Sequence, residues 1–134
     1  MSIKAEGFDK VRVILAGLYK FGEEEPFNQA VLALNDEMMF LYNDHAPDVV
    51  SGDEWIYNIK ERFLLNDVET VIDETLLKRP ELSGLNRLAI LIAGEEDPHY
   101  FYYYTENVKE VKNFLAALKH FGVETTSRKV KVEM

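Results

Sequence analysis

The chain consists of short apolar segments separated by polar residues that favour turns, and none is long enough to span a bilayer. The segment LALNDEMMFLYN, residues 32–43, shows this pattern, because two apolar runs flank Asn35-Asp36. Asn and Asp tolerate the positive φ of a tight two-residue turn, and Val31, Phe40 and Tyr42 favour extended backbone. We therefore predict a β-hairpin here, although Leu34, Met38 and Leu41 also have helical spacing.

Further segments of this kind predict more strands. Residues 11–21, VRVILAGLYKF, favour a strand by their β-branched and aromatic content. A helix that begins at Asp9 and ends at Gly22 is the alternative for that segment. The residues from Trp55 alternate in polarity, and 68–77 is a further apolar segment. Residues 87–94, RLAILIAG, and 99–105, HYFYYYT, predict a second hairpin closed by the polar turn GEEDP.

The hydrophobic period changes near the end of the chain. In TENVKEVKNFLAALKHFG, residues 105–122, apolar side chains recur at helical spacing. Thr105 or Asn107 is placed to cap the first turn, and Gly122 follows the last one. The pattern predicts an amphipathic helix over about 106–121.

The expected architecture is a single domain, because the chain has 134 residues and 47% of them are apolar. We expect a mainly β fold with about seven antiparallel strands in a curved sheet or partly open barrel, closed by the C-terminal helix. Residues 1–8 are expected to be a loose lead-in and 9–122 the domain. Residues 123–134 form a basic tail that is either disordered or a short strand.

The charge of the chain excludes several classes of partner. The formal net charge is −9, which opposes binding to nucleic acid or to an anionic membrane. Six acids and no base lie between Asp36 and Glu54, which favours a basic partner for that region. The absence of cysteine removes disulfides and thiolate metal sites, and no segment has the pattern of a signal peptide. We therefore expect a cytoplasmic protein.

Catalytic and cofactor motifs are absent from the sequence. There is no glycine-rich phosphate loop and no nucleophile elbow, and we expect no cofactor. The strongest cluster of polar groups is the loop of residues 44–54, where Asp44, His45 and Asp48 are a weak candidate for a divalent cation or small ligand. The loop lacks the regular ligand spacing of a calcium loop, so a solvated acidic loop is the preferred interpretation.

The aromatic run HYFYYY is the clearest candidate for a contact surface. On a strand, Tyr100, Tyr102 and Tyr104 point to one side while Phe101 and Tyr103 point to the other. One set must fill the core. Tyrosine is enriched at protein interfaces, so the other set predicts a contact face unless the helix or a loop covers it.

Three stretches resemble the pleckstrin-homology (PH) superfold, and in particular the bacterial PH-like domains: AVLALNDEMMFLYN, FLLNDVETVIDETL, and RLAILIAG followed by HYFYYYTENVKEVKNFLAAL. Together they cover most of residues 29–121. The resemblance implies a scaffold that binds something. The loop that would hold a phosphoinositide headgroup in that family corresponds to FGEEEPFN, where Glu23, Glu24 and Glu25 repel phosphate.

The sequence thus predicts a non-enzymatic binding or assembly module that acts through protein–protein contacts, by self-association into a homo-oligomer or with a protein partner. Phosphoinositide binding is not expected. The candidate contact residues are Trp55, Tyr102 and Tyr104. A small-ligand or metal-dependent domain that uses loop 44–54 is the alternative.

Overall fold

The computed structural model describes residues 2–5, 13–19, 28–43, 49–51, 54–57, 59–77 and 84–131. This part of the chain is mostly β, with one α-helix near its C-terminal end. The strands are β1 (Ser2–Ala5), β2 (Val13–Tyr19), β3 (Asn28–Leu34), β4 (Met38–Asn43), β5 (Val49–Ser51), β6 (Glu54–Tyr57), β7 (Ile59–Leu64), β8 (Val68–Leu77), β9 (Leu85–Ile92), β10 (His99–Tyr104) and β11 (Glu124–Lys131). The helix is α1 (Val108–His120), and short 3₁₀ turns occupy Leu65–Asp67 and Thr105–Asn107.

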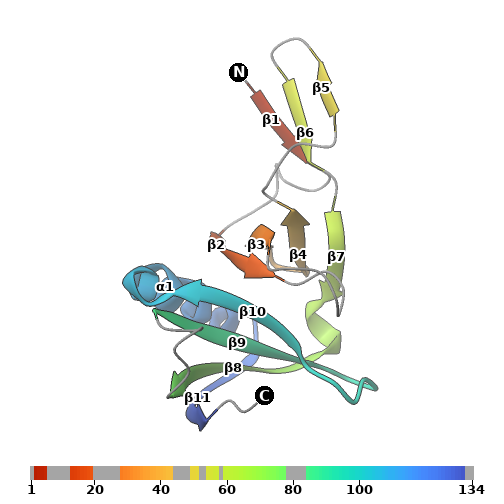
Figure 1. Ribbon diagram of the computed structural model, residues 1–134. Coiled ribbons are helices and arrows are strands. Elements are labelled where there is room, and N and C mark those ends of the chain that lie inside the picture. Colours follow the sequence, from red (N-terminus) through yellow and green to blue (C-terminus); the bar gives the residue numbers. More distant parts are fainter. Residues whose placement is uncertain are drawn as a thin grey trace.

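The strands form two sheets (Figure 1). The main sheet has eight strands in the order β11-β8-β9-β10-β2-β3-β4-β7, and it does not close into a barrel among the described residues. Every neighbouring pair is antiparallel except β11 with β8, which run parallel. The smaller sheet has the order β1-β6-β5. The mainly β class with a C-terminal helix is confirmed, and the expected number of strands is exceeded.

The hairpin between β3 and β4 follows the prediction, with its apex one residue later than expected. The backbone N–H of Asn35 donates to the backbone carbonyl of Met38 at 3.0 Å, so Asp36 and Glu37 form the tip of the hairpin. The Asn35 side chain is buried, and its Oδ1 accepts from the backbone N–H of Glu37 at 2.8 Å and of Met38 at 2.7 Å. The Asn35 side chain therefore forms an Asx turn that stabilises the tip of the hairpin.

We expect Asn35→Ala to lower the free energy of unfolding by about 1–2 kcal/mol, because two backbone donors lose their acceptor. Asn35→Asp keeps an acceptor oxygen and should cost less. Asp36→Ala, at the exposed tip, is the control and should change stability by less than about 0.5 kcal/mol. Urea unfolding of the three variants measures the effect, and equal losses for Asn35→Ala and Asp36→Ala would remove this role.

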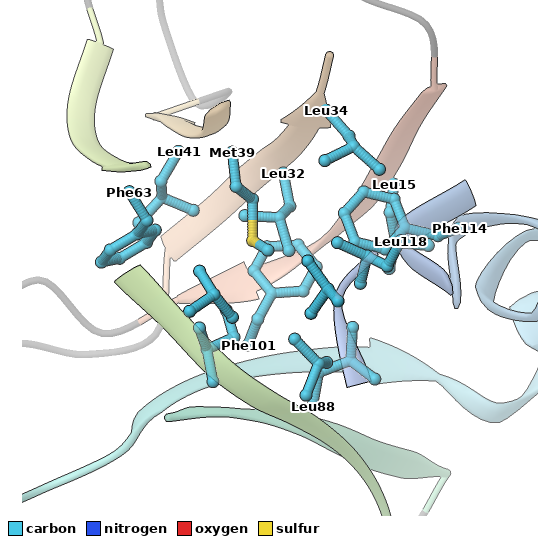
Figure 2. Packing of buried hydrophobic residues seen from close by; sticks show 14 of the residues in the cluster. Leu15, Leu32, Leu34, Met39, Leu41, Phe63, Leu88, Phe101, Phe114 and Leu118 are labelled. Atoms are coloured by element: carbon cyan, nitrogen blue, oxygen red, sulfur yellow. The ribbon is translucent and has the colours of Figure 1, made fainter. Parts of the chain in front are cut away.

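The helix packs its apolar stripe against the side of the main sheet that carries the hydrophobic core. Val111, Phe114 and Leu118 are fully buried, and Figure 2 shows Phe114 and Leu118 beside Leu15 of β2. The helix ends where predicted. Gly122 has φ +90°, and the Val123 amide donates to the Leu118 carbonyl at 2.9 Å, a bond that closes the last turn. No helix in the described part of the chain is long and apolar enough to cross a membrane.

Several segment boundaries differ from the expectation. The lead-in contains β1, whose parallel partner β6 begins about fifty residues later, with Ser2 opposite Glu54. The expected loop 44–54 contains β5, in which Val49 and Val50 are β-branched. Of the two alternatives for the tail, the structure has a strand, and β11 extends the main sheet to Lys131. These pairings are long-range, so the local sequence pattern does not reveal them.

Candidate interaction surface

The aromatic strand β10 divides its side chains between two sides of the sheet, as its alternation predicts. Phe101 and Tyr103 are fully buried in the core. Tyr100 and Tyr102 are half-buried on the opposite side, which we call the outer side, and Tyr104 at the strand end is 41% exposed. The Tyr103 hydroxyl donates to Asp73, and burial followed by this hydrogen bond raises the pKa of Tyr103.

A row of ion-paired side chains lies on the outer side of the sheet next to these tyrosines. Glu74 of β8 is fully buried, and directly opposite it are Arg87 of β9 and Arg128 of β11. The Arg87 Nε donates to Glu74 Oε1 at 2.5 Å, and the Arg128 Nε donates to Glu74 Oε2 at 2.6 Å. Each carboxylate oxygen is therefore paired, as a buried charge requires.

Arg87 connects this carboxylate to the tyrosines. Its guanidinium carbon lies 3.9 Å from the centre of the Tyr100 ring, and its Nη1 donates to the Tyr102 hydroxyl at 3.3 Å. Burial alone would lower the pKa of Arg87, but the hydrogen bonds to Tyr102 and Glu74, together with the Glu74 charge, raise it. Arg87 therefore stays charged and holds both rings.

The result is a mixed aromatic and cationic patch whose side chains contact one another. We call Tyr100, Tyr102, Arg87 and Arg128 the tyrosine–arginine face. Arg87 is nearly buried, whereas Tyr100 and Tyr102 are half-buried and the Arg128 side chain is 54% exposed. The tyrosines and Arg128 are therefore the members of the face that contact solvent. Fixed aromatic side chains lose little conformational entropy when they bind, and Tyr and Arg contribute strongly at protein interfaces. This face is suited to contact with another macromolecule.

The predicted site residues do not all meet. Tyr102 belongs to the tyrosine–arginine face and lies at its β10 end, and Tyr104 lies further along the same strand. Trp55 belongs to β6 in the smaller sheet, and its side chain is outside the described residues. The weak metal candidates Asp44, His45 and Asp48 also lie outside them. No group of three metal-ligating side chains occurs among the residues that are described.

Sequence reasoning missed the partners of Tyr102. In the sequence alone, Glu74 lies within a strand pattern and Arg87 begins an apolar run. Arg128 is one of several bases in the C-terminal tail. Their alignment on neighbouring strands depends on the register of β8, β9 and β11. The one local indication of a buried ion pair is the charged residue Arg87 at the start of the apolar run RLAILIAG.

A second polar cluster joins the turn before β10 to β2 and β7. His99 Nδ1 lies 3.4 Å from the Tyr19 hydroxyl, and its Nε2 lies 3.0 Å from Glu95 Oε1. The His99 ring packs edge-on against Phe63, with 4.8 Å between ring centres. Burial raises the pKa of Tyr19, and the charges of Glu61 and Glu95 raise it further. The cluster ties three parts of the fold together.

Comparison with protein-family models gives no match, and comparison with curated proteins gives none. Among solved structures, the hSac2 domain from human phosphoinositide phosphatase Sac2 is similar with a TM-score of 0.55 and 13% identity, over 92% of this chain and 79% of that one. The linker-DH/PH domains of p115-RhoGEF match with a TM-score of 0.47 and 10% identity, over 84% of this chain and 29% of that one. The DH/PH domains of PDZ-RhoGEF, solved in complex with activated RhoA, match with a TM-score of 0.46 and 6% identity, over 83% of this chain and 29% of that one.

These similarities concern the fold. The structural neighbours include chains with PH domains, and nothing in the comparisons indicates a bacterial family. The expectation of a non-enzymatic protein is corrected, because the neighbour with a TM-score of 0.55 is a domain of a phosphatase. The fold therefore gives no ground for excluding an enzyme, and a fold alone does not assign a function.

Proposed function

We propose that this protein is a PH-like domain that binds another protein through its tyrosine–arginine face. The PH-like assignment is supported by the run of antiparallel strands that precedes one amphipathic helix, which is the layout that the sequence resemblance implied. The parallel strand β11 after the helix is an addition to that layout. The narrower resemblance to bacterial PH-like domains rests on the sequence pattern alone.

The observation that carries the binding proposal is the fixation of Tyr100 and Tyr102 by Arg87. Arg87 contacts both rings while its Nε is bonded to the buried Glu74. The rings are thus ordered before a partner arrives, which reduces the entropic cost of association. An unsupported surface tyrosine would have to be ordered on binding.

The charge of the chain bears on the kind of partner. A net charge of −9 repels acidic macromolecules at long range and attracts basic ones, so we expect a partner with net positive charge. Glu23, Glu24 and Glu25 disfavour a phosphoinositide headgroup for the same reason. Association should accordingly weaken as salt concentration rises.

Affinity purification from cells that express the protein tests the proposal. The tagged wild type is expected to retain a stoichiometric protein that the double variant Tyr100→Ser/Tyr102→Ser loses. Lys112→Ser, on the exposed side of α1, is the control and should retain it. Retention by the double variant would contradict the proposal, as would specific binding of the wild type to phosphoinositide vesicles in place of any protein.

The alternative of a metal or small-ligand site in loop 44–54 stays a prediction. A ligand that binds only the folded state raises the melting temperature. A panel of divalent cations and metabolites therefore separates the two functions, and a saturable rise in melting temperature would favour the alternative.

A further inference from the structure

The strand β11 ends the main sheet (Figure 1). Its eight residues pair with β8 in unbroken register, and among the described residues no strand pairs with its other edge. In a parallel pair, alternate residues direct their backbone N–H and C=O groups away from the neighbouring strand. Within the described part of the chain, this edge therefore offers a row of backbone hydrogen-bonding groups to no other strand, and such an edge is a template for a further strand.

The sequence of β11, ETTSRKVK, is complementary to itself in one register. In an antiparallel pair of two copies centred on Thr126, Glu124 of each copy lies directly opposite Arg128 of the other, and Thr125 lies opposite Ser127. Opposite charges and hydroxyl pairs stabilise such directly opposed positions. Centring on Ser127 would place Glu124 opposite Val130, and centring on Arg128 would place two guanidinium groups face to face.

Arg128 is oriented by an ion pair and is still accessible for this pairing. Its guanidinium is bonded to the buried Glu74, and the side chain is still 54% exposed. All side chains of β11 are exposed except those of Thr125 and Val130, which are half-buried. Its charged residues discourage pairing with an arbitrary edge, because an apolar or basic strand would leave them unmatched.

We propose that a second copy of this chain pairs antiparallel with β11 in the Thr126-centred register. The two-fold axis then runs perpendicular to the sheet, so both tyrosine–arginine faces lie on the same side of one continuous sheet. This inference shares Arg128 with the tyrosine–arginine face but does not depend on the binding proposal, since either can hold without the other. If both hold, the dimer is bivalent and gains avidity for a repetitive partner.

Engineered disulfides test the register, because the chain contains no cysteine. In this pairing the two Thr126 Cα atoms are about 4.5–5.5 Å apart, which suits a disulfide. The two Ser127 Cα atoms are about 8 Å apart, beyond the reach of one. Thr126→Cys should therefore form a disulfide-linked dimer under mild oxidation, while Ser127→Cys should remain largely without a crosslink. Preferential crosslinking of Ser127→Cys, or equal yields, would overturn the proposal.

Light scattering of the unmodified protein provides the second measurement. The wild type should dimerise with increasing concentration, and Glu124→Arg should raise the dimer dissociation constant roughly tenfold, because Arg would then face Arg128 at two symmetric positions. Glu110→Arg makes the same charge change on the exposed side of α1 and should leave the constant unchanged. A wild type that stays monomeric at millimolar concentration, or equal effects of both variants, would overturn the proposal.

Discussion

Glu74→Gln is expected to lower the free energy of unfolding by about 3 kcal/mol. Glu74 is fully buried and accepts from Arg87 and Arg128 through separate oxygens. Glutamine has the same shape but carries no charge, and its amide group presents N–H donors to a guanidinium that also donates. The nearly buried Arg87 would lose its counter-charge, which is the costly way to break a buried ion pair.

Glu69→Gln is the matched control for this prediction. Glu69 lies on the same strand β8 and is exposed, so the same chemical change should alter stability by less than about 0.5 kcal/mol. Arg128→Ala should fall between the two, at about 1 kcal/mol, because Arg128 is half-exposed and leaves Glu74 paired with Arg87. Guanidinium unfolding at pH 7 measures all three variants. A Glu74→Gln protein as stable as the control would show that the ion pairs of Glu74 with Arg87 and Arg128 do not stabilise the sheet.

Gly17→Ala is expected to destabilise the protein by about 3 kcal/mol, since it forces atoms together where β2 crosses β10. A Cβ at position 17 would lie 2.2 Å from the Tyr102 carbonyl oxygen and 2.6 Å from the Phe101 ring. The nearer of these atoms is backbone, so a change of side-chain rotamer does not relieve the overlap. Among the described residues the two strands pair in register at Tyr102 and Leu18, immediately beside this contact.

Gly94→Ala separates this overlap from the general cost of replacing glycine. Gly94 has φ +85°, and a Cβ there would meet nothing within 4 Å. Its replacement should cost about 1 kcal/mol, from backbone conformation alone. Thermal unfolding should therefore show a clearly larger loss for Gly17→Ala, and a loss equal to or smaller than that of Gly94→Ala would mean that β2 and β10 do not approach as closely as described.

Local signals account for the elements that the sequence predicts well. The stripe of Val111, Phe114 and Leu118 and the stop at Gly122 lie within one helix, and the Asn35 turn lies within one hairpin. The sequence pattern does not resolve the strands β1 and β11, because their partners are distant in sequence. β1 is also only four residues long, and β11 is mostly polar. Strand propensity reflects packing against neighbours, which a single sequence does not display.

The part of the candidate surface that follows from a local pattern can be predicted from the sequence. The alternation of β10 separates Tyr100 and Tyr102 from the buried Phe101 and Tyr103 by period alone. The support beneath these tyrosines was not predictable, because an acid within VETVIDETLL reads as a solvent-facing residue. Only the register of three strands shows that Glu74 is buried between two arginines.

Photocrosslinking from position 102 tests the central claim most directly. A photoreactive phenylalanine analogue at Tyr102, introduced in cells that express the protein, should crosslink one defined protein on irradiation. The same analogue at Lys112, on the exposed side of α1, should not crosslink that protein. An identical crosslinking pattern from both positions, or none from position 102, would contradict a role of the tyrosine–arginine face in protein contact.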